Sequence, residues 1–138
     1  MKTTTLIDEQ AEKDLLGYML LAPENPDVAD CSEDLFGTKN HRDIAAVILH
    51  LVEHRIPVDY LEVIQELRRR GKNPSAAYIS DLCQGVVLAR PIERRITYLR
   101  ELSQRRKLAA LAESLAERAP NLADPLPVIL ATILESVQ

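Results

Sequence analysis

Residues 125–137 read PLPVILATILESV, and this stretch decides the fold class. Its apolar side chains stand three, four and seven positions apart, which places them on one stripe of a 3.6-residue helix. The stripe consists of Leu126, Ile129, Leu130, Ile133, Leu134 and Val137. Asp124 is placed to cap this helix, and Pro125 to occupy its first position, where a missing N–H costs nothing. The pattern predicts an amphipathic helix that packs against other helices.

The composition of the chain agrees with an all-α protein. Its 138 residues are 46% hydrophobic but include one Phe and no Trp, so the core must be aliphatic. The β-branched and aromatic runs that mark strands are missing. Four glycines leave little room for nucleotide-binding loops or hairpin turns.

Capping residues, prolines and glycines divide the rest of the chain into amphipathic helices. We predict helices over about residues 8–21, 40–54, 59–70, 75–83, 91–118 and 125–137, with a turn or short helix at 27–31 and a capped turn that buries Phe36. Asn40 is the expected cap of the 40–54 helix, and Asp59 forms a capping-box variant with Glu62. The expected architecture is a compact multi-helix head, residues 1–88, followed by a projecting C-terminal helical hairpin, residues 89–138.

The sequence carries no recognisable catalytic, cofactor or metal site. Gly71 and Lys72 are followed by Asn73, so a P-loop is absent. His41, His50 and His54 lack a completing ligand set and are interpreted as surface or capping residues, and Glu9 and Glu12 as helix-surface residues. We therefore expect a chain that is not an enzyme and binds no cofactor.

Charge, cysteine content and hydropathy limit the kinds of partner and the cellular location that we expect. The net charge of −4 weighs against nucleic acid as the main partner, so DNA contact is expected to be indirect or weak. Cys31 and Cys83 are interpreted as free, buried or half-buried thiols. No signal peptide and no membrane-spanning run is recognisable, so we expect a cytoplasmic location and no membrane partner.

The hairpin offers the best candidate interaction surface, because two helices cannot bury both of their apolar stripes against each other. The predicted self-association residues are Leu108, Leu111, Leu115, Ile129, Leu130, Ile133 and Leu134. A polar interruption in the long helix is a solvated stretch or a partner-facing belt; the residues proposed for docking are Arg100, Arg105, Arg106 and Lys107. Arg68, Arg69 and Arg70 close a helix, where cations favour the helix dipole.

Several short motifs occur in the order found in one known family. They are AEKDLLG at 11–17, the Phe36 turn followed by His41-Arg42-x-Ile44, Pro57-Val58-Asp59, Leu67-x-x-Arg70-Gly71, Ala77-Tyr78-Ile79-x-x-Leu82, and Arg100-Glu101 with Arg106-Lys107-Leu108. Together they resemble the N-terminal domain of the DnaB-type replicative helicases over about residues 9–118.

The resemblance implies a non-catalytic assembly and docking domain. Such domains pair through their hairpins into a collar, a trimer of dimers, on the hexameric motor, and they dock primase and a helicase loader. The RecA-like motor is absent from this sequence, and we expect an excised domain rather than a stand-alone relative. The alternatives are a small helix-turn-helix-like nucleic-acid-binding domain, suggested by the break at Arg55–Asp59, and an enzyme of unrecognised type.

Overall fold

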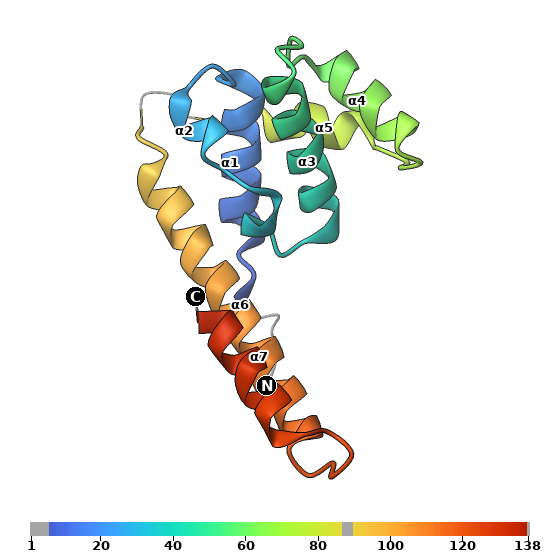
Figure 1. The fold of residues 1–138 in the computed structure, drawn as a ribbon. Coiled ribbons are helices and arrows are strands. Elements are labelled where there is room, and N and C mark those ends of the chain that lie inside the picture. The colour runs from blue at the N-terminus through green and yellow to red at the C-terminus, as the bar shows by residue number, and fades with distance from the viewer. Residues whose placement is uncertain (1–5, 87–89, 138) are drawn as a thin grey trace.

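The computed structural model describes residues 6–86 and 90–137, and these residues form only helices and loops. The all-α class is thereby confirmed (Figure 1). The helices are α1 (Glu9–Leu21), α2 (Pro26–Ala29), the 3₁₀-helix η2 (Glu33–Leu35), α3 (Lys39–Glu53), α4 (Tyr60–Arg69), α5 (Ala76–Leu82), α6 (Glu93–Arg118) and α7 (Leu126–Val137).

The head is built around α3, which packs against α1, α2, η2 and α4. Its core is aliphatic, as the composition predicts, and contains Leu15 and Met19 of α1 together with Ile44 and Ile48 of α3, all of them buried. Phe36 follows η2 and is 1% exposed, so the prediction that this turn buries the single Phe is confirmed. The head therefore has one continuous hydrophobic core, to which the first turns of α6 also contribute.

Side-chain caps set several helix starts. The carboxylate of Asp59 accepts a hydrogen bond from the Glu62 amide at 2.8 Å, which confirms that predicted cap. The prediction for α3 was wrong, because the helix begins at Lys39, before Asn40. Thr38 has extended dihedral angles and its carbonyl accepts from the Arg42 amide, so the cap position is Thr38.

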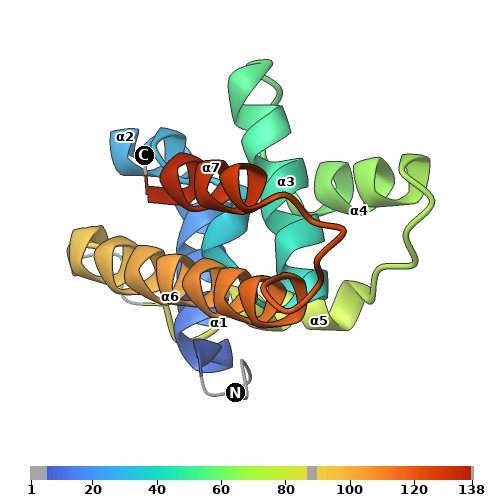
Figure 2. The same cartoon turned by 60° about the horizontal axis from the view of Figure 1, so that its bottom comes forward.

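The last two helices lie side by side as a hairpin (Figures 1 and 2), and Figure 1 shows this hairpin projecting from the head. Helix α6 packs against α1, η2 and α7. Helix α7 begins one residue later than predicted, because the carbonyl of Pro125 accepts from the Ile129 amide and Pro125 takes the cap position expected for Asp124. The predicted boundary between residues 88 and 89 lies outside the described residues.

Candidate interaction surface

The inner side of the hairpin is a small apolar contact between α6 and α7. Ala109 and Ile129 are buried there, apart from the core cluster of the head. Leu111, Leu115 and Ile133 are half-buried. These four predicted interface residues, Ile129 among them, are thus covered wholly or in part within one chain.

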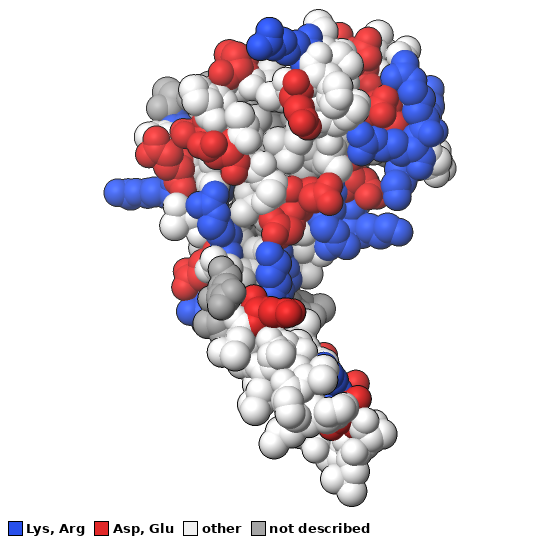
Figure 3. Space-filling view, viewed as in Figure 1, with Lys and Arg blue, Asp and Glu red and all other residues white. Residues whose placement is uncertain are grey.

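The outer side of the hairpin leaves large apolar side chains in solvent. Leu126, Leu130 and Leu134 follow one another every four residues along α7, and each is at least half exposed. Leu108 on α6 is exposed as well. The hairpin is the part of the space-filling view with the fewest charged side chains (Figure 3). The side chain of Val137 lies outside the described residues.

The basic residues predicted for docking differ in how much they are engaged by their own chain. Arg105 forms an exposed i,i+4 ion pair with Glu101 at 3.1 Å, and Arg100 is exposed. Lys107 contacts the carboxylate of Asp34 in η2 at 2.6 Å. Arg100 and Arg105 therefore face solvent, whereas Lys107 ties the hairpin to the head.

Arg106 also connects the hairpin to the head. Its guanidinium donates to the carbonyl oxygens of Leu6 at 2.9 Å and Asp34 at 3.2 Å, and the side chain is half-buried. Burial acts to lower the pKa of Arg106, but a guanidinium remains charged throughout the physiological range. The polar stretch of α6 is therefore the place where the long helix crosses η2 and the N-terminal segment.

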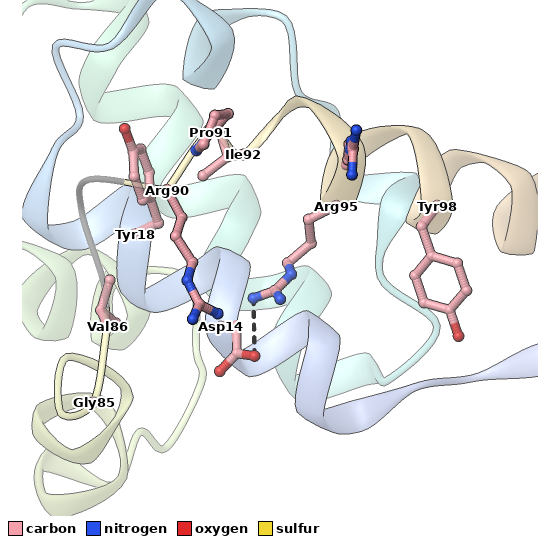
Figure 4. Close-up of a pocket in the computed structure, with 10 residues that line it drawn as sticks. Asp14, Tyr18, Gly85, Val86, Arg90, Pro91, Ile92, Arg95 and Tyr98 are labelled. Atoms are coloured by element: carbon pink, nitrogen blue, oxygen red, sulfur yellow. Dashed lines mark ion pairs between the residues drawn. The ribbon is translucent and has the colours of Figure 1, made fainter.

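A second tie lies where α6 starts, beside a cavity of about 430 Å³ between α1 and α6 (Figure 4). The guanidinium of Arg95 reaches the carboxylate of Asp14 on α1 at 2.8 Å. One turn further along, the Tyr98 hydroxyl donates to Asp8 at 2.9 Å. These contacts fix the direction in which α6 leaves the head.

Glu12, His41 and Tyr78 form a polar network that connects α1, α3 and α5. Glu12 is 0% exposed and His41 1% exposed. The Glu12 carboxylate lies 2.8 Å from Nδ1 of His41 and accepts from the amides of Gly37 at 2.8 Å and Thr38 at 3.3 Å. The other ring nitrogen of His41 is hydrogen-bonded to the Tyr78 hydroxyl. The network satisfies the buried charge of Glu12 and holds the turn before α3 against α1.

This network corrects two sequence-based interpretations. Glu12 was expected on a helix surface and His41 at the surface or as a cap, but both are buried. The spacing carried a signal: apolar residues follow Glu12, and likewise His41, at three, four and seven positions, so each polar side chain stands on the apolar stripe of its helix. His54 does act at a helix end, where its Nδ1 lies 2.9 Å from the carbonyl of His50.

The acid stability of the protein is expected to depend on Glu12. Burial acts to raise the pKa of the Glu12 carboxyl, but the hydrogen bonds from His41, Gly37 and Thr38 outweigh it and hold that pKa below its ordinary value. A lowered folded-state pKa contributes stability above the unfolded pKa, near 4.3, that is lost as pH falls through the folded pKa.

The test compares urea unfolding of wild type and Glu12→Gln from pH 6 down to pH 3. We expect wild type to be more stable at pH 6 and the difference between the two proteins to shrink in acid. A difference that stays constant over this range would contradict the assignment of the ionised form to Glu12.

The described part of the chain offers few other groups for metal binding or thiol chemistry. No group of three or more His, Cys, Asp or Glu side chains is arranged to hold a metal ion there. Cys31 is a free, buried thiol whose pKa burial raises to about 11, and Cys83 is free and half-buried, as predicted. No helix among the described residues is both long enough and apolar enough to cross a bilayer.

The fold and the surface together define a class: a helical head that carries a projecting hairpin with an apolar outer stripe. Residues 5–104 match the family model described as the DnaB-like helicase N-terminal domain. The chain therefore belongs to this family, that of the N-terminal domains of DnaB-type replicative helicases.

A solved structure extends the likeness into the hairpin. The chain is similar to the crystal structure of the N-terminal domain of DnaB helicase from Mycobacterium tuberculosis, with a TM-score of 0.81 and 22% sequence identity. The match covers 95% of this chain and 96% of the other. At this identity the comparison shows the fold alone. Because 95% of this chain is matched, the matched part must include the hairpin.

Proposed function

We propose that this chain is a cytoplasmic, non-catalytic assembly and docking domain of a replicative DNA helicase. In this proposal the chain self-associates through its hairpin, as in the collar of a hexamer, and offers surfaces for primase and a helicase loader. The observation that carries the proposal is the exposed leucine stripe of α7, Leu126, Leu130 and Leu134.

The stripe supports an association site for a physical reason. A fully exposed leucine side chain forgoes about 1.5–3 kcal/mol of burial free energy, and neighbouring ones act as a patch. Helix α7 packs against α6, and Ile129 is buried and Ile133 half-buried on α7, whereas the three leucines remain largely outside that contact. The hairpin of a second copy carries the same exposed leucines, so it is a surface of matching polarity.

The test is the double substitution Leu130→Asp and Leu134→Asp, measured by sedimentation velocity over a concentration series. We expect a folded protein whose self-association is at least about tenfold weaker, because each carboxylate would have to be desolvated in the contact. Circular dichroism should be unchanged, since both leucines are already at least half exposed.

Leu61→Asp is the matched control. Leu61 is 62% exposed on α4 of the head, close to the 64% of Leu134, so it tests the effect of a new surface charge away from the hairpin. It should associate like wild type. If wild type stays monomeric at high concentration, or if Leu61→Asp weakens association equally, the hairpin is not the association surface.

We also propose that primase and a helicase loader dock on this chain. Arg100 and Arg105 are exposed on α6, the first helix of the hairpin, and are our candidates for binding an acidic partner surface. Light scattering of this chain with and without a primase C-terminal domain tests for a complex. A complex that persists when both arginines are replaced by glutamine would assign docking to other residues.

A further inference from the structure

Charge on the head is segregated along the chain. Residues 24–34 contain five carboxylates and no basic residue, whereas residues 68–72 contain four basic residues and no carboxylate. We call the first group the acidic face; it consists of Glu24, Asp27, Asp30, Glu33 and Asp34. We call the second group the basic face; it consists of Arg68, Arg69, Arg70 and Lys72.

The fold places these two faces on different sides of the head. The acidic face lies on and around α2 and η2, and the basic face lies at the end of α4. Both α2 and α4 pack against α3, and Figures 1 and 2 show them on opposite sides of it. In Figure 3, blue side chains gather over α4 with some red ones among them, and the α2 side carries several red side chains with some blue ones. Excess negative charge thus lies on the α2 side of α3, and excess positive charge on the α4 side.

The basic face keeps an excess of positive charge after its own contacts are counted. Arg69 and Arg70 share Glu66, at 2.9 and 3.3 Å. Lys72 reaches Asp43 at 3.6 Å, and Arg68 is exposed without an ion pair to any described residue. Lys39 adds a further cation, since it lines a groove together with Lys72.

The acidic face likewise keeps an excess of negative charge. Glu24, Asp30 and Glu33 are exposed, and none has an ion pair with a described residue. Asp34 is paired with Lys107 at 2.6 Å, Arg106 donates to the Asp34 carbonyl at 3.2 Å, and the charge of Arg100 on α6 acts on the Cys31 thiol next to Asp30. These three cations are outnumbered by the five carboxylates.

We propose that the acidic face of one copy docks on the basic face of a second copy. This proposal rests on the proposed function, because it describes a further contact of the same self-associating domain. The two faces carry opposite excess charge on one chain, so the partner with the matching potential is another copy of that chain. The overall charge of −4 favours this partner over a nucleic acid for the basic face.

The contact would differ in symmetry from the hairpin contact. Two hairpins can meet through the same surface on both copies, which closes a pair. A contact between two different faces is head-to-tail, so it continues into a ring or a chain of copies. Exposed ion pairs contribute little each, so the head contact acts only when the hairpin already holds copies close together.

The experiment reverses the charge of each face separately and then of both together. The basic-face variant is Arg68→Glu with Arg69→Glu, and the acidic-face variant is Glu24→Lys with Asp30→Lys. At about 0.01 M ionic strength, where the screening length is about 30 Å, wild type should sediment as species larger than a pair, and these should fall back to pairs at about 1 M. Each single-face variant should stop at pairs, with the larger species at least about tenfold less populated.

The variant with both faces reversed is the decisive test. The chain with both faces reversed is again complementary to itself and should recover the larger species. Arg94→Glu with Asp81→Lys, exposed residues outside both faces, keeps the net charge and should behave like wild type. The proposal is overturned if the single-face variants sediment like wild type or if the doubly reversed chain does not recover.

Two further outcomes separate this proposal from its alternatives. The Leu130→Asp, Leu134→Asp variant tests pairing through the hairpin alone. If the pairs form but the head contact does not, the proposed function stands and only the head contact is contradicted. Fluorescence anisotropy with labelled dT20 tests the other candidate for the basic face. DNA binding that disappears in the basic-face variant, without any salt-sensitive larger species, would assign that face to nucleic acid and overturn the proposal.

Discussion

Glu12→Ala is expected to lower the free energy of unfolding by about 3–5 kcal/mol, because three donors lose their carboxylate acceptor and each donor left unsatisfied costs about 1–3 kcal/mol. The substitution takes away the acceptor of three hydrogen bonds, from His41 and from the Gly37 and Thr38 amides. These donors would remain buried without a partner, which costs more than the lost bonds themselves. The loss is a large share of the 5–15 kcal/mol that typical domains have.

The measurement is urea unfolding at pH 7 followed by circular dichroism, with Glu9→Ala as the matched control. Glu9 stands in the same first turn of α1 but is exposed, so its removal should cost at most about 1 kcal/mol through the helix dipole. A Glu12→Ala protein that unfolds at the same urea concentration as Glu9→Ala would show that the network does not stabilise the head.

The network also explains how two separate motifs of the sequence act together. Glu12 stands in the AEKDLLG stretch, and His41 stands 29 positions later in the His41-Arg42-x-Ile44 stretch. Their hydrogen bond joins α1 to α3, and Tyr78 extends it to α5. Arg42 contributes from the other side, since its guanidinium donates to the carbonyl of Gly37 at 2.9 Å. The turn between η2 and α3 is thus held by side chains of both motifs.

Local chemistry made most of the helices predictable. Asp59 and the φ of +76° at Gly71 mark the two ends of α4, where the sequence places a cap and a helix-ending glycine. Periodicity correctly found the inward faces of α1 and α3, because burial of aliphatic residues follows the helical repeat. The start of α3 was missed because Asn40 is a good cap by residue type, and the actual start depends on how η2 presents the chain to α1.

Contacts between distant segments were beyond the reach of the sequence pattern. The polar stretch around Arg106 was interpreted as solvated or partner-facing, whereas its guanidinium binds backbone carbonyls 100 and 72 positions away. Every residue has a backbone carbonyl, so the sequence does not indicate which carbonyls will accept a hydrogen bond from a distant arginine. For the same reason, spacing alone put Ile129 and Leu130 on one stripe, and only the crossing of α6 and α7 decides that Ile129 is buried and Leu130 exposed.

Gly17 is the residue at which a usually favourable substitution is expected to have the opposite sign. In the interior of an exposed helix, alanine is preferred over glycine by about 1 kcal/mol. At Gly17 an added Cβ would lie 2.0 Å from the carbonyl oxygen of Leu82 and 2.7 Å from Cγ2 of Val86. The first of these atoms belongs to the backbone of α5, so the contact can be relieved only if α5 moves away from α1.

We therefore expect Gly17→Ala to lower the free energy of unfolding by about 1–3 kcal/mol, the cost of overpacking a close contact. Ala110→Gly, at an exposed position of α6, calibrates the ordinary preference and should lose about 1 kcal/mol. Adding Val86→Ala to Gly17→Ala removes the side-chain clash and leaves the one with the Leu82 carbonyl, so the rescue should be partial. Urea unfolding of the four proteins decides the matter: a Gly17→Ala chain as stable as wild type would mean that α1 and α5 do not approach each other closely enough to require glycine.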